Sequence, residues 1–256
     1  MTSPSSESSS EPSNDAADVL LTRSTDGVLL LTLNRPDARN ALSPELIAAL
    51  EAALDDFVAD DGLRAAVLTG SGSAFCAGLD LKRFAAAGAD RRSASRLIRR
   101  FGTLPKPVIG AVNGWCVTGG LELALGLDWL VAGPGAMFAD THLKVGAFPG
   151  GGLTARLGRI VGTRTAKAMS LGGLRLDAQA ALLAGLVTQV VPEERLVEHA
   201  VEQAGRIAAA NQDLVRIVRD LHDGNIDRPL TKALAVEYAR REEWRSIGPQ
   251  TWTVQS

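Results

Sequence analysis

The sequence predicts an α/β fold, and three observations lead to this prediction. Short apolar segments with β-rich composition recur, most clearly at residues 28–33, 64–69 and 108–112. Glycine-rich turns follow two of these regions, and glycine allows a backbone to approach a ligand closely. Beyond residue 152 the chain is chiefly helical apart from a strand at 187–191. Strand, strand and helix alternate without a clean sequence period.

The predicted organisation has three parts. Residues 1–17 are rich in Ser, Pro, Glu and Asn and nearly devoid of apolar side chains, which predicts a disordered tail. Residues 18–195 form the core, and residues 196–256 form a C-terminal helical region. A chain of 256 residues, 46% of them hydrophobic, can bury a large core of this kind.

The first half of the core begins with a strand at 28–33, followed by the turn Asn34-Arg35-Pro36. Ser43-Pro44-Glu45 then supplies an N-cap, a proline at the first helical position and an early acid, which predict a helix to about residue 58. After the strand at 64–69, a basic helix is expected at about 90–101, and the prolines that follow end it.

The second half of the core begins with a buried strand at 108–112. A short apolar helix follows at 119–127, in which Glu122 is the one charged side chain before Asp128. Short strands are expected at 129–131 and 137–139, and a loop at 146–152. The helical segments 196–209 and 230–244 alternate apolar and charged residues, so each has a face that needs a partner.

Composition excludes several classes of protein. The net charge of −2 gives no general attraction to nucleic acid or to an anionic membrane. Two cysteines are too few for a disulfide framework, and no Cys/His cluster has zinc spacing, so we expect no metal site and a reducing, cytoplasmic location. No apolar segment approaches the roughly 20 residues of a membrane span, and a soluble protein is expected.

Two glycine turns are the strongest functional signal. One is 75–81, Phe-Cys-Ala-Gly-Leu-Asp-Leu, and the other is 113–122, which ends in Thr-Gly-Gly-Leu-Glu. Such turns leave backbone N–H groups free, and two N–H groups aimed at one point form an oxyanion hole. Glu122 lies within a helical turn of the second candidate amide. The dinucleotide fingerprint, the phosphate-binding loop and the Gly-x-Ser-x-Gly elbow are all absent from the sequence.

Five ordered blocks, spread over about residues 19–200, resemble the crotonase family, the enoyl-CoA hydratase and isomerase superfamily. They are Asn34-Arg35-Pro36 with 39–42, residues 74–81, Lys106-Pro107-Val108-Ile109 with Asn113-Gly114, residues 119–124, and Phe148-Pro149-Gly150-Gly151-Gly152. The resemblance implies a spiral of ββα turns that binds acyl-CoA, with no further cofactor, and a role in fatty-acid or lipid metabolism.

The resemblance also assigns residues. The amides that would hold the thioester oxygen belong to Leu79 and Gly119, and Glu122 matches the first of two glutamates that handle water and the α-proton in hydratases. The implied substrate-binding residues are Arg39, Ala41, Ala77, Gly78, Asp80, Leu81, Lys82, Gly120 and Asp140.

The second glutamate of the hydratases falls on His142 in this chain, counting without gaps from Pro149. Imidazole transfers protons near neutrality, so the replacement is compatible with catalysis. Asp140, two residues earlier, either orients His142 or caps a turn. His142 itself has an alternative structural interpretation, Glu122 could be a surface acid, and Asp80 could be a turn-capping residue.

These observations predict an enoyl-CoA hydratase-like lyase that adds water across a 2-enoyl-CoA. Isomerisation, thioester hydrolysis and non-catalytic acyl-CoA binding are the alternatives. The family also implies that the helical end assembles trimers or hexamers. The end of this chain departs from the family, because Ser246-Ile247-Gly248-Pro249 interrupts the last helix.

Overall fold

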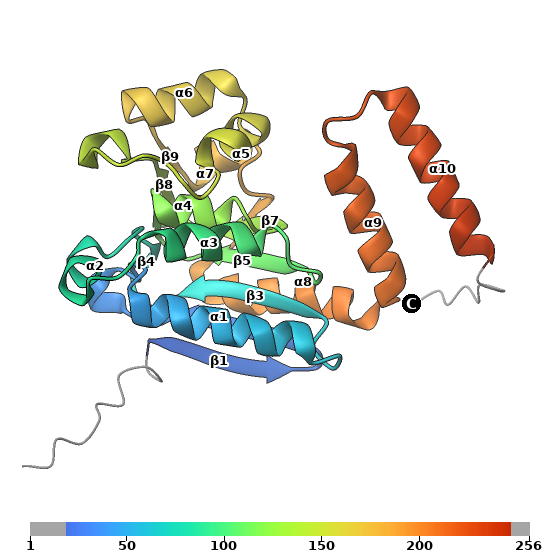
Figure 1. The fold of residues 1–256 in the computed structure, drawn as a ribbon, viewed down its shortest axis with the longest axis horizontal. Helices are drawn as coiled ribbons and strands as arrows, with labels where there is room; N and C mark the ends of the chain where they lie inside the picture. The colour runs from blue at the N-terminus through green and yellow to red at the C-terminus, as the bar shows by residue number, and fades with distance from the viewer. Residues whose placement is uncertain (1–18, 247–256) are drawn as a thin grey trace, which may run out of the picture.

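The computed structural model describes residues 19–246, and Figure 1 shows an α/β core from which two helices extend to one side. The tail expected at 1–17 and the interrupted end at 247–256 lie outside the described residues. Within residues 19–246, no helix is both long and apolar enough to cross a membrane.

The core contains two sheets. The larger sheet has the strand order β1 (Leu20–Thr25), β2 (Val28–Leu33), β3 (Ala65–Gly70), β5 (Val108–Val112), β7 (Trp129–Ala132) and β10 (Gln189–Val190). Only its β1–β2 pair is antiparallel. The smaller sheet has the order β4 (Ala74–Cys76), β6 (Trp115–Val117), β8 (Met137–Ala139) and β9 (Arg175–Asp177), with β9 antiparallel to β8.

Helices follow the strands around these sheets. They are α1 (Pro44–Ala59), α2 (Leu81–Ala87), α3 (Arg92–Phe101), α4 (Gly119–Ala124), α5 (Leu153–Ile160), α6 (Thr163–Gly172), α7 (Ala178–Leu183), α8 (Leu196–Ala209), α9 (Gln212–Asn225) and α10 (Leu230–Ser246). Short 3-10 turns occupy η1 (Pro36–Ala38), η2 (Leu143–Val145) and η3 (Glu193–Arg195). The expected start of α1 is confirmed, since the Ser43 hydroxyl accepts the Leu46 amide at 3.2 Å.

Consecutive strands alternate between the two sheets, from β3 to β4, from β5 to β6 and from β7 to β8. Each such pair leads into a helical segment, so the predicted spiral of ββα turns is confirmed. Apolar side chains fill both faces of the large sheet. One face packs against α8 through residues such as Val67 and Ile109, and the other contributes Leu68 to the larger core around α1 and α3.

The expectation that structure begins at Val28 is wrong, because β1 precedes it and pairs with β2 across an Asp26-Gly27 turn. Both turn residues have positive φ, as a two-residue hairpin turn of type I′ requires. β1 lacks an apolar signal because it is an edge strand with only Leu20 buried. The strands β4, β6 and β9 and the helix α2 were also not anticipated, and each has seven residues or fewer.

The C-terminal helices divide into two sets. α8 packs on the large sheet through Leu196, Ala200, Ala204 and Ala208, so by packing it belongs to the core although it lies after residue 195. α9 and α10 extend from the core in Figure 1. Arg219 of α9 tethers them to the core through an ion pair with Asp128 at 2.5 Å and a hydrogen bond to the Leu104 carbonyl.

Candidate active site

The candidate site residues follow three strands of the smaller sheet. β4, β6 and β8 are parallel, and the chain after them carries Gly78 and Leu79, then Thr118 and Gly119, then 140–142. The carboxyl ends of parallel strands share one edge of a sheet, where ligands commonly bind. The Thr118 amide donates to the Ala139 carbonyl at 2.9 Å, so this arrangement continues beyond the strands.

Leu79 and Gly119 lie close together at this edge, as the sequence predicts. A Cβ placed on Gly119 would be 3.6 Å from the Leu79 nitrogen, and one placed on Gly78 would be 3.2 Å from the Gly119 nitrogen. Gly78 has φ +96°, which a side chain would strain. Within residues 19–246, neither the Leu79 nor the Gly119 N–H donates a hydrogen bond. Two free amides at one place can bind a developing oxyanion.

Close backbone packing fixes this pair of amides. A Cβ on Gly120 would lie 2.1 Å from the Cys76 carbonyl oxygen, so only glycine lets α4 approach β4 this closely. Thr118, just before Gly119, has φ +56° without being glycine. Its hydroxyl accepts the Thr141 amide at 3.2 Å and shares a 2.5 Å hydrogen bond with the Thr141 hydroxyl. These bonds tie the candidate oxyanion hole to the segment that carries His142.

Glu122 is buried, with 3% of its surface exposed, so it is not a surface acid. Its Oε1 accepts the Gly151 amide at 2.7 Å and the Leu153 amide at 3.3 Å. These donors fix the orientation of the carboxylate and stabilise its charge. Its other oxygen, Oε2, faces His142. One oxygen is therefore held by the protein and the other is available for chemistry.

His142 lies directly beside Glu122, as the gapless count predicts. Its Nε2 is 3.7 Å from Glu122 Oε2, and its Nδ1 is 2.7 Å from Asp140 Oδ1. All three side chains are buried. Burial alone would raise the pKa of Asp140, but the hydrogen bonds from the His142 side chain and backbone and from Ser170 outweigh it and hold that pKa below its usual range.

The other predicted binding residues form two adjacent segments. Residues 39–42 and 77–80 lie alongside each other, because Ala77 N donates to Arg39 O at 3.0 Å and Leu42 forms a parallel bridge with Leu79. Ala41 is buried, whereas Arg39, Leu81 and Lys82 are exposed. Arg39 and Lys82 are therefore exposed cations in or next to these two segments.

Asp80 is occupied within the protein. It caps α2 by accepting the Arg83 amide at 3.1 Å, and it pairs with Arg35 at 2.8 Å. The turn-capping interpretation of Asp80 therefore describes its contacts. Each of its two carboxylate oxygens already has a partner within the protein. Arg35 was assigned no role from the sequence although it lies in one of the resemblance blocks. Thr118 and Thr141 were also missed, because nothing in the sequence indicates the positive φ of Thr118 or its hydrogen bonds to Thr141.

Several other groups take no part in this site. Cys76 and Cys116 are buried, and burial raises the pKa of the Cys76 thiol to about 12, so neither is a ready nucleophile. His199 hydrogen bonds to Gln189 at 2.6 Å and to Gln203 at 2.8 Å. No group of three or more His, Cys, Asp or Glu within residues 19–246 is placed to hold a metal ion.

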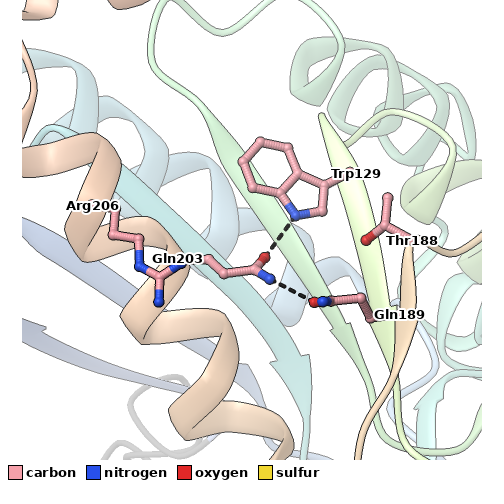
Figure 2. Close-up of a pocket in the computed structure, with 5 residues that line it drawn as sticks. All are labelled: Trp129, Thr188, Gln189, Gln203 and Arg206. Carbon is pink, nitrogen blue, oxygen red and sulfur yellow. Dashed lines mark hydrogen bonds between the residues drawn. The ribbon is translucent and has the colours of Figure 1, made fainter.

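A surface pocket of about 580 Å³ lies elsewhere, against α8 (Figure 2). Its lining residues are Trp129, Thr188, Gln189, Gln203 and Arg206. The Trp129 indole donates to Gln203 at 2.9 Å and the Gln203 amide donates to Gln189 at 2.8 Å, as the dashed lines in Figure 2 show. This network satisfies its own polar groups and contains no acid–base pair, unlike the site around Glu122.

Comparison with known proteins agrees with this geometry. The sequence model of the enoyl-CoA hydratase/isomerase family matches residues 23–246. A mitochondrial enoyl-CoA hydratase of Pongo abelii is 38% identical over 211 residues, 81% of this chain and 73% of the relative. A mevalonyl-coenzyme A hydratase of Beauveria bassiana is 42% identical over 206 residues, 75% of this chain and 74% of that protein.

A solved structure of an enoyl-CoA hydratase from Mycobacterium smegmatis is 44% identical, with a TM-score of 0.72, and covers 90% of this chain and 100% of its own. The chain belongs to the enoyl-CoA hydratase/isomerase family, and the predicted resemblance is confirmed.

Proposed function

We propose that this protein is an enoyl-CoA hydratase that adds water across the double bond of a 2-enoyl-CoA thioester. The observation that carries the proposal is the buried Glu122, with one oxygen held by two amides and the other 3.7 Å from His142 Nε2. The unused amides of Leu79 and Gly119 provide the matching oxyanion site. The hydratase names of the relatives support the same reaction.

In the proposed mechanism, Glu122 Oε2 removes a proton from water while the water oxygen bonds to Cβ of the substrate. The electron pair of the double bond moves toward the thioester oxygen, and the Leu79 and Gly119 N–H groups stabilise the enolate. The His142 ring, protonated at both nitrogens with Nδ1–H held by Asp140, then delivers its Nε2 proton to Cα. Transfer of the proton from Glu122 to His142 restores both groups. His142 thus replaces the second glutamate of the hydratases.

The CoA moiety is proposed to bind along residues 39–42 and 77–82. The exposed cations Arg39 and Lys82 would meet its phosphates, and binding away from the reacting bond would supply affinity. The mevalonyl-coenzyme A hydratase among the relatives indicates that the acyl group differs within the family. The proposed substrate is therefore the class of 2-enoyl-CoA thioesters.

We further propose a trimer or a pair of trimers. Leu230, Leu234 and Tyr238 are exposed by 73%, 56% and 61%, and their spacing places them on one stripe of α10. A stripe of this kind on a projecting helix needs an apolar partner. Light scattering at micromolar concentration should give the mass of a trimer or hexamer, and a monomer would contradict the proposal.

Because Cys76 and Cys116 are unpaired thiols, we also propose a reducing, cytoplasmic location, which cell fractionation would test.

A panel of acyl-CoA esters monitored by mass spectrometry tests the reaction. Hydration adds the mass of one water to crotonyl-CoA. Isomerisation of an enoyl-CoA leaves the mass unchanged, and hydrolysis releases free CoA. Binding without any of these products would identify a non-catalytic acyl-CoA-binding protein and overturn the proposal.

A further inference from the structure

Asp140 makes two hydrogen bonds to the same residue through one oxygen. Its Oδ1 accepts the His142 backbone amide at 3.0 Å and lies 2.7 Å from His142 Nδ1. Only 2% of the Asp140 side chain is exposed. The carboxylate is therefore held by His142 at two points, which is more than capping a turn requires.

This pairing determines which ring nitrogen of His142 is available. A carboxylate cannot donate, so Nδ1 must carry the hydrogen of the bond to Asp140. Nε2 is then left to face Glu122 Oε2 at 3.7 Å. We infer that Asp140 is a positioning residue that fixes the tautomer and orientation of His142 so that Nε2 is the proton-transfer atom. The expected effect on kcat rests on the proposed hydration, whereas the expected tautomer does not.

The charges around the ring support the same role. Glu122 approaches from α4 and Asp140 from the end of β8, and within residues 19–246 these are the two ion-pair partners of His142. Ser170 of α6 contacts Asp140 from the third packed element and is uncharged. Lys144, in the same turn as His142, is exposed. A protonated ring would donate one N–H toward each carboxylate.

Nuclear magnetic resonance of isotope-labelled histidine nitrogens tests the positioning directly. The chain has only three histidines, so His199 and His222 serve as internal references. The neutral His142 ring should carry its proton on Nδ1 in the parent. In Asp140→Ala and in the better size-matched Asp140→Asn, that fixed tautomer should be lost. An unchanged tautomer in both variants would overturn the inference whether or not the protein turns over crotonyl-CoA.

Kinetics supplies the second readout. Asp140→Asn should lower kcat by roughly 10²–10³-fold, within the range of lost general acid–base help, while KM changes by no more than about threefold. The matched control is Asp128→Asn, which removes a largely buried carboxylate that pairs with Arg219 away from the site. Equal changes in both variants would indicate general destabilisation and contradict a specific role. A parent without hydratase activity would refute the proposed function, and the resonance experiment would still decide the positioning.

Discussion

Glu122→Gln separates the chemistry of the site from its architecture. The glutamine carbonyl can occupy the position of Oε1 and accept the Gly151 and Leu153 amides, which now donate at 2.7 and 3.3 Å. The amide nitrogen then replaces Oε2 opposite His142. The fold and the candidate CoA surface should therefore remain unchanged, whereas the base that removes the water proton is lost.

The expected loss follows from that single change. General acid–base help contributes about 10²–10⁴-fold, equivalent to roughly 3–5 kcal/mol of barrier. We expect kcat on crotonyl-CoA to fall by at least about 10²-fold with butyryl-CoA affinity nearly unchanged, measured by enoyl-thioester absorbance and by calorimetry. Glu51→Gln is the matched control, since Glu51 pairs with Arg100 at a partly exposed position on α1. A Glu122→Gln variant that retains more than about one third of the parent kcat would refute the assignment of Glu122 as the base, since the assignment requires a loss of about 10²-fold or more.

Four further predictions concern His142, Thr118, Asp140 and the binding of the CoA moiety. His142→Ala should lower turnover by roughly 10²–10⁴-fold, and His142→Glu should retain or raise it; an alanine variant as fast as the parent would make His142 structural. Thr118→Val leaves the Thr141 amide without its acceptor, at a cost of about 1–3 kcal/mol, so thermal melting should drop by several degrees, whereas Thr118→Ser should melt like the parent. The pKa of Asp140 is lowered in the folded protein, so its contribution to stability is present above the unfolded pKa of about 3.9 and is lost as the pH falls through the folded pKa. The difference in melting temperature between the parent and Asp140→Asn should therefore shrink over that pH interval. A difference that grew would contradict the assignment. Butyryl-CoA should bind more tightly than butyrate by calorimetry, and equal affinities would exclude a CoA-binding surface.

The sequence predicts much of the fold because long elements carry strong local signals. The helices α1 and α8 were predicted within one residue of their bounds, α1 from its serine cap, proline and apolar spacing, and α8 from its apolar spacing. β4, β6 and β9 were missed as strands because three residues carry no usable period and their pairing depends on partners distant in sequence. α2 was missed because its helical pattern spans only seven residues after a glycine turn.

The same division applies to the site. Gly119 and Glu122 stand out in the sequence because a glycine pair and a charge in an apolar helix are unusual. The contacts of Asp80 with Arg35 and of Thr118 with Thr141 could not be predicted, because they join segments 45 and 23 residues apart through side-chain geometry. The pairing of His142 with Asp140 is local, yet its chemical meaning depends on Glu122 reaching the ring from another element.

Incubation of the parent protein with crotonyl-CoA in water labelled with heavy oxygen tests the central claim most directly. The account predicts that one labelled oxygen enters the acyl chain at Cβ, that the thioester stays intact, and that Glu122→Gln abolishes this incorporation while still binding the ligand. Absence of label from the acyl chain, or label recovered only in a released carboxylate alongside free CoA, would contradict hydration by Glu122 and His142.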